Sequence, residues 1–176
     1  MRPQVIRKGA ADFRVAPNLR DPDTERGVFS WDSVRHELAG LPGGGLNIAY
    51  EAVDRHADGP RAAQIAFRWL PRDGPERTFS YTNLKGLTNR FANVLRGLGA
   101  NKGDRLFVLA GRIPELYVGV LGGLKIGMTV SPLFSAFGPE PIRTRMDLGQ
   151  GKVLLTTESL YRRKVEKVRA SLLTLK

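Results

Sequence analysis

The sequence predicts an α/β protein with a partial, doubly wound parallel sheet and flanking helices, preceded by an N-terminal helical arm and a β-hairpin. Two observations carry this prediction. From residue 82 to residue 173, short apolar runs alternate with longer segments of helical periodicity, which is typical of a parallel sheet covered on both faces. Before them, apolar and polar residues alternate over 64–70, and a second short run at 77–81 follows a turn rich in Pro and Gly, which indicates a hairpin.

The N-terminal part is expected to be less regular. Residues 1–29 are rich in Pro, Asp and Arg with little periodicity, and we expect an extended arm there. Ser30 is a suitable N-cap for a short helix, because its hydroxyl can accept from a free backbone N–H of the first turn. The Gly-rich segment 41–45 then breaks the chain. A second helix is expected over 46–56, with Asp54 pointing outward.

The region after the hairpin gives the clearest periodicity. Apolar residues recur at helical spacing up to Leu98, with Thr82 as the expected N-cap and Gly97 or Gly99 as the end of the helix. The later expected strands are 105–110, 128–133 and 152–156, and the later expected helices begin at Pro114, Pro139 and Glu158, the last of them continuing to Leu173.

Ligands of open α/β sheets bind beyond the carboxyl ends of the strands. Those ends fall at residues 110–112, 133–137 and 156–158. Arg162, Arg163 and Lys164 follow the last expected strand, and three cations at a sheet's ligand edge can hold a phosphate by charge-assisted hydrogen bonds. The alternative interpretation of these three residues is a solvated helix face.

The composition limits the possible functions. The 176 residues include 28 basic and 17 acidic ones, a formal charge of +11, which attracts anions such as phosphates. A nucleic-acid partner is disfavoured, because few aromatic residues stand among the basic ones. No cysteine is present, which excludes disulfides and thiol chemistry. No apolar run is long enough to span a membrane and no secretory signal is visible, so we expect a cytoplasmic protein without a membrane partner.

Known catalytic motifs are missing. Gly97 to Gly103 resembles a dinucleotide-binding loop, but it follows a helix instead of a strand and its spacing is wrong. Ser135 follows a strand without a nearby base, and the two histidines are too few for most His-rich metal sites. Asp54 and Asp104 are expected to form ordinary surface pairs. We therefore expect no catalytic residue and no metal ligand in this chain.

Several segments in order resemble the AMP-forming acetyl-CoA synthetases, within the acyl-adenylate-forming ligase superfamily. The resemblance covers about residues 25 to 165. The segments that carry it are LNIAYEAVDRH (46–56), TFSYTNL (78–84), IPELYV (113–118), LKIGMTVSPLF (124–134) and FSAFGPEPI (134–142).

The resemblance implies the N-terminal portion of an enzyme that makes acetyl-CoA from acetate, ATP and CoA. It implies an arm and helices over 1–58 and an incomplete AMP-binding domain over 59–176. ATP, CoA and Mg²⁺ are implied for the full-length enzyme. None is expected to bind tightly here, because the family's Lys-containing phosphate loop and catalytic lysine domain are missing, and the chain alone is expected to be inactive.

The resemblance also implies a CoA surface. Ser135 and Ala136 stand where the family often carries paired glycines, and basic residues after the next strand meet the CoA 3′-phosphate. The implied surface comprises Phe134, Ser135, Ala136, Arg162, Arg163 and Lys164. Two rival hypotheses remain: a non-enzymatic module that binds anions or nucleic acid, and an interaction fragment that self-associates through an exposed sheet edge.

Overall fold

The computed structural model describes residues 8–16, 18–19 and 21–176, so the opening of the expected arm lies outside the described residues. The chain divides into two compact units, Met1–Leu38 and Ala39–Lys176. The domain boundary expected after residue 58 concerns the family's domains and stays a prediction.

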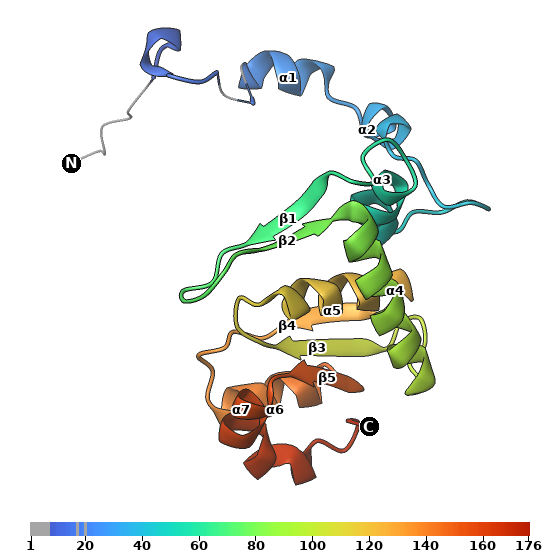
Figure 1. Ribbon diagram of the computed structural model, residues 1–176, viewed down its shortest axis with the longest axis vertical. Helices are drawn as coiled ribbons and strands as arrows, with labels where there is room; N and C mark the ends of the chain where they lie inside the picture. The colour runs from blue at the N-terminus through green and yellow to red at the C-terminus, as the bar shows by residue number, and fades with distance from the viewer. Residues whose placement is uncertain (1–7, 17, 20) are drawn as a thin grey trace. The chain divides into compact units, whose positions relative to one another are not determined.

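The described part of the first unit contains three short helices joined by irregular segments (Figure 1). Asp21 caps the first α-helix by accepting from the backbone N–H groups of Asp23 and Thr24, and Ser30 caps the second helix as predicted. An extended arm is therefore wrong for part of the first 29 residues, because an Asp N-cap followed by Pro starts a helix without any long apolar periodicity. The elements of this unit are the 3-10 helix η1 (Ala10–Asp12), α1 (Pro22–Val28) and α2 (Trp31–Glu37).

The second unit begins with a short helical segment, the π-helical turn η2 (Tyr50–Asp54) followed by α3 (Arg55–Ala57). Asn47 starts it, because its Oδ1 atom accepts from the backbone N–H groups of Ala49 and Tyr50. A helix in this region is confirmed, but the outward direction expected for Asp54 is wrong. Asp54 turns toward the ammonium group of Lys125, which is distant in the sequence.

The predicted β-hairpin is confirmed. Strands β1 (Ile65–Trp69) and β2 (Arg77–Ser80) pair antiparallel, with Phe67 opposite Phe79. The rings of these two residues stack at 4.5 Å between centroids, and Phe67 also contacts Tyr117 of a later helix. The hairpin is thus held to the rest of its unit by aromatic packing.

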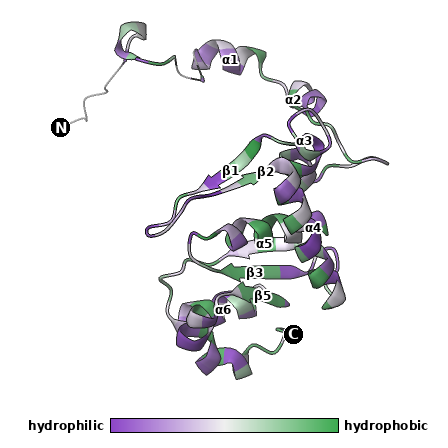
Figure 2. Ribbon diagram, in the orientation of Figure 1, coloured by the Kyte–Doolittle hydropathy of each residue, from purple (hydrophilic) through white to green (hydrophobic). Residues whose placement is uncertain are grey.

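A three-stranded parallel sheet forms the centre of the second unit, in the order β4-β3-β5 (Figure 1). Alternate residues of the central strand face two separate cores: Leu106 and Val108 toward one, Phe107 and Leu109 toward the other. In Figure 2 most of this strand is coloured as hydrophobic, and one end is hydrophilic. The predicted α/β class is confirmed. The elements are α4 (Tyr81–Gly97), β3 (Arg105–Leu109), α5 (Pro114–Lys125), β4 (Thr129–Pro132), α6 (Pro139–Leu148) and β5 (Val153–Thr156).

Two helix boundaries differ from expectation. Ser80, not Thr82, caps α4, because Ser80 and Asn83 exchange reciprocal hydrogen bonds in a capping box. The single helix expected after β5 is split into α7 (Glu158–Leu160), the π-helical η3 (Tyr161–Val165) and the 3-10 helix η4 (Glu166–Ser171). The wide π turn lets Leu160 and Val165, five residues apart, both enter the same core.

Candidate functional site

The carboxyl ends of the parallel strands meet at one edge of the sheet, where two groups of predicted residues lie. Phe134, Ser135 and Ala136 follow β4, and the basic residues follow β5 on η3. The two groups are distant in the sequence, so their proximity depends on the crossover through α6.

Lys164 joins these two groups. Its Nζ atom donates hydrogen bonds to the carbonyl oxygens of Ser135, at 2.6 Å, and Phe137, at 2.7 Å. An ammonium group has three N–H donors, so one remains after these contacts. Lys164 therefore links η3 to the loop after β4 by two hydrogen bonds.

The aromatic side chains of the same loop contact each other and an arginine of α6. The rings of Phe134 and Phe137 meet edge to face at 5.7 Å, and the guanidinium carbon of Arg145 on α6 lies 4.2 Å from the Phe137 ring centroid. Phe134 remains 64% exposed. Sequence reasoning missed Arg145. The available signal was its place on the helix that starts at Pro139, just after the loop.

Arg162 and Arg163 have different surroundings from Lys164. Both are exposed. Arg162 pairs with Glu158 at 2.6 Å, and the Nε of Arg163 donates to the carbonyl of Ser159 at 3.2 Å. Both contacts lie within the same helical segment and use only part of each five-donor guanidinium group. These two side chains therefore keep donors that can reach a phosphate.

The charge of another basic residue, Arg143, is neutralised by an ion pair. On α6, Arg143 pairs with Glu140 at 2.8 Å. The hydrogen bond from Arg143 lowers the pKa of the Glu140 carboxyl, and the same contact raises the pKa of Arg143. The pair stays charged at neutral pH, so Arg143 adds little free positive charge to the edge.

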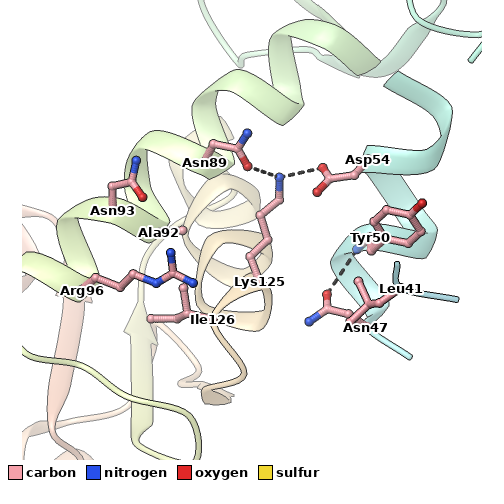
Figure 3. Close-up of a pocket in the computed structure, with 10 residues that line it drawn as sticks. All are labelled: Leu41, Asn47, Tyr50, Asp54, Asn89, Ala92, Asn93, Arg96, Lys125 and Ile126. Carbon is pink, nitrogen blue, oxygen red and sulfur yellow. Dashed lines mark hydrogen bonds and ion pairs between the residues drawn. The ribbon is translucent and has the colours of Figure 1, made fainter. Parts of the chain in front are cut away.

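A polar pocket of about 390 Å³ lies at the opposite end of the sheet, where α4 leads into β3 and α5 leads into β4 (Figure 3). Within it, the Nζ atom of Lys125 at the end of α5 donates to Asp54 at 2.6 Å and to the side-chain oxygen of Asn89 at 2.5 Å. The pocket is lined by Leu41, Asn47, Tyr50, Asp54, Asn89, Ala92, Asn93, Arg96, Lys125 and Ile126.

The ordinary surface pairs expected at Asp54 and Asp104 are instead partly buried ion pairs with lysines that are distant in the sequence. Lys125 and Asp54 have side chains only 9% and 17% exposed. Asp104 pairs with Lys152, and the pKa of Asp104 is lowered by that hydrogen bond and by the N–H of Asn101. Both ion pairs connect segments that are far apart in the sequence, so they form only in the tertiary fold.

A further titratable residue, His56, packs against an aromatic ring. His56 lies against the ring of Tyr81 at 5.0 Å, and burial lowers the pKa of this histidine. Within residues 8–16, 18–19 and 21–176, no three His, Cys, Asp or Glu side chains gather as a metal site would require. In the same described part of the chain, no helix is both long and apolar enough to cross a membrane.

Comparison with known proteins gives consistent matches. The profile of the family described as AMP-binding enzyme matches residues 53–175. The acetyl-coenzyme A synthetase of Bacillus subtilis (strain 168) is 36% identical over 147 residues, which cover 83% of this chain and 26% of that protein. The 3-hydroxypropionyl-coenzyme A synthetase of Metallosphaera sedula is 36% identical over 121 residues, covering 69% of this chain and 18% of that protein.

Solved structures agree. The crystal structure of a Brucella canis acyl-CoA synthetase superposes with a TM-score of 0.72 at 28% identity, covering 88% of this chain and 27% of that one. An anthranilate CoA ligase in complex with anthranoyl-AMP gives a TM-score of 0.66 at 22% identity, over 77% of this chain and 24% of the other, and shows the shared fold alone. The chain therefore spans about a quarter or less of the length of the curated relatives that it matches.

Proposed function

This chain belongs to the family of AMP-binding enzymes, and from that premise we propose that it is the N-terminal portion of an acetate–CoA ligase. In the proposed reaction, acetate attacks the α-phosphorus of ATP to give acetyl-adenylate and pyrophosphate. The thiol of CoA then displaces AMP to give acetyl-CoA. The proposal is supported by the similarity to acetyl-coenzyme A synthetases over most of this chain.

The chain's own contribution to this reaction is a CoA surface at the carboxyl edge of the sheet. The observation that carries the proposal is the contact of Lys164 with the carbonyls of Ser135 and Phe137, because it places the loop after β4 next to the cations of η3. Arg162 and Arg163 hold the 3′-phosphate of CoA with their spare donors. Phe134 and Ala136 line the path of the rest of the molecule.

ATP and Mg²⁺ do not fit the residues present. The sequence contains no Ser/Thr/Gly-rich loop followed by a lysine, which is the phosphate loop that the resemblance implies for the family, and the described residues hold no cluster of metal ligands. We assign no step of the adenylation to this chain, and we propose that it makes no acetyl-adenylate by itself. Exchange of labelled pyrophosphate into ATP with acetate tests this: a rate equal to the blank is expected, and clear turnover refutes it.

Calorimetry with CoA and dephospho-CoA tests the binding surface. We expect weak binding of CoA and weaker binding of the dephospho form, because only CoA carries the 3′-phosphate. The double variant Arg162→Gln, Arg163→Gln removes this difference, whereas Arg90→Gln, an exposed arginine on α4, keeps it. Equal affinity of the unaltered chain for both ligands, or no binding of either, refutes the proposed CoA surface.

Self-association through a sheet edge is a separate proposal about partners. Strands β4 and β5 flank β3, and in the described part of the chain each has a strand partner on one side only. Light scattering tests it: a mass that rises with concentration supports self-association, and a monodisperse monomer refutes it. A salt-dependent gel shift with nucleic acid would support the rival binding module instead. The cytoplasmic location expected from the sequence stays a prediction.

A further inference from the structure

We propose that the pocket between α4, the end of α5 and the segment 41–54 binds a small oxyanion, the phosphate or carboxylate group of a small molecule (Figure 3). This site goes beyond the proposed function, because it lies at the amino end of the strands, whereas the CoA surface lies at their carboxyl end. Its proposed ligands are the cationic side chains of Arg96 and Lys125.

Lys125 supplies a fixed, desolvated cation. Its side chain is 9% exposed, and Asp54 and Asn89 accept two of its three N–H donors, at 2.6 and 2.5 Å. The third donor has no protein acceptor among the described residues, although the side chain lines the pocket. Because the ammonium is already held, little side-chain entropy is lost when an anion takes the third donor.

Arg96 supplies the second cation. Asn89, Asn93 and Arg96 follow at i, i+4 and i+7 on α4, so they lie along one helix face. Figure 3 shows the guanidinium group of Arg96 extending beside Ile126 toward Lys125. No carboxylate in the described part of the chain forms an ion pair with Arg96, so all five of its N–H donors can serve a ligand.

The charge and the apolar lining of the pocket indicate the chemical class and size of the ligand. The lining residues include two cations, Arg96 and Lys125, and one carboxylate, Asp54, which is engaged by Lys125. The excess of one positive charge favours an anion. Ala92 and Ile126 give the pocket an apolar part, and its volume of about 390 Å³ exceeds the space that a single phosphate ion fills. The expected occupant is therefore a small organic acid or phosphate monoester, in a pocket of ordinary ligand size.

Titration of the ¹⁵N-labelled chain with inorganic phosphate, and separately with acetate, tests the site and distinguishes the two anion classes. We expect the amide signals of α4 residues 89–96 and of residues 125–126 to shift, with a saturating dependence on at least one of the two anions. Both probes are run at low salt, because chloride competes for exposed cations.

Three variants test whether the shifts in the amide signals come from anion binding in this pocket. Arg96→Gln is expected to weaken the apparent affinity at least about fivefold, since a charge-assisted Arg–oxyanion pair is lost. Asn93→Asp, which places a carboxylate in the pocket, is expected to abolish saturation. Arg90→Gln, also exposed on α4 but outside this pocket, is the control and is expected to stay within about twofold.

Two outcomes overturn the proposal: no saturating shift with either anion, or equal losses in Arg96→Gln and Arg90→Gln, which would indicate general attraction by a basic protein. Neither outcome depends on CoA binding or on adenylation. Failure of the site and failure of the proposed function are therefore distinguishable.

Discussion

Replacing Lys164 by Met should loosen the loop after β4 while the sheet stays intact. The ammonium group donates to the carbonyls of Ser135 and Phe137, and hydrogen bonds that involve a charged group stabilise a protein by about 1.5–3 kcal/mol each. Both loop residues are only half-buried, so water replaces much of what is lost. We therefore take about 1.5 kcal/mol for the two bonds together, which corresponds to about a tenfold change in an equilibrium constant.

Amide hydrogen exchange of the ligand-free chain measures this change. The N–H of Phe137 donates to the carbonyl of Phe134 at 3.0 Å within the loop, so its exchange reports local opening. We expect it to exchange about tenfold faster in Lys164→Met, while the amide of Leu106 in β3 is unchanged. Lys164→Arg should restore part of the protection, because it keeps the cation.

Arg163→Gln is the matched control, since Arg163 neighbours Lys164 and its side chain donates, within the described part of the chain, to the carbonyl of Ser159 in its own helical segment. An exchange rate of Phe137 that is the same in Lys164→Met as in the unaltered chain would refute the reasoning. An equal acceleration in Arg163→Gln would also refute it, because the effect would then follow from lost charge in general.

Two further predictions concern stability, measured as the free energy of unfolding in urea. An added methyl group at Gly122 would lie 2.8 Å from the ring of Phe91, so Gly122→Ala should destabilise the fold by about 1–2 kcal/mol. A methyl group at Gly86 meets no atom within 4 Å, so Gly86→Ala should stabilise the fold by about 0.5–1 kcal/mol. Equal effects of the two substitutions would contradict the packing argument. The pKa of Asp104 is lowered in the fold by its hydrogen bond from Lys152, so its stabilising contribution is present above the ordinary Asp pKa and is lost as pH falls through the lowered folded value. Asp104→Asn should flatten this acid dependence, and an unchanged pH profile would contradict it.

Local patterns were sufficient to predict the elements of the sheet. Strands β3 and β5 are short, largely apolar runs, β4 is flanked by Met128 and Leu133, and the intervening helices carry apolar stripes. These strand and helix patterns identify the elements without knowledge of their partners. The errors occur where a different local rule acts. The capping box of Ser80 and Asn83 moved the start of α4, and the Asp21–Pro22 start signal produced α1 in a segment without periodicity.

The contacts that define the candidate sites could not be read in the same way. Asp54 was expected to face outward because it follows an apolar face, yet its direction is set by Lys125, 71 residues later. The pocket in Figure 3 likewise needs three segments that only the tertiary fold brings together. Periodicity describes one helix at a time, whereas an ion pair across segments depends on how helices pack against one another.

The basic cluster after β5 shows why charge in a sequence is an incomplete guide to a ligand site. Arg162, Arg163 and Lys164 are adjacent, but only the two arginines are exposed with donors to spare, while the lysine is engaged by two carbonyls. If the proposed CoA surface is correct, substituting the arginines and substituting the lysine should change ligand binding in different ways. Neutralising the arginines should remove the preference for CoA over dephospho-CoA, because they meet the 3′-phosphate. Neutralising Lys164 should weaken the binding of CoA and of dephospho-CoA equally, because it displaces the loop that both ligands contact. A loss of affinity for CoA alone would instead indicate that Lys164 contacts the 3′-phosphate.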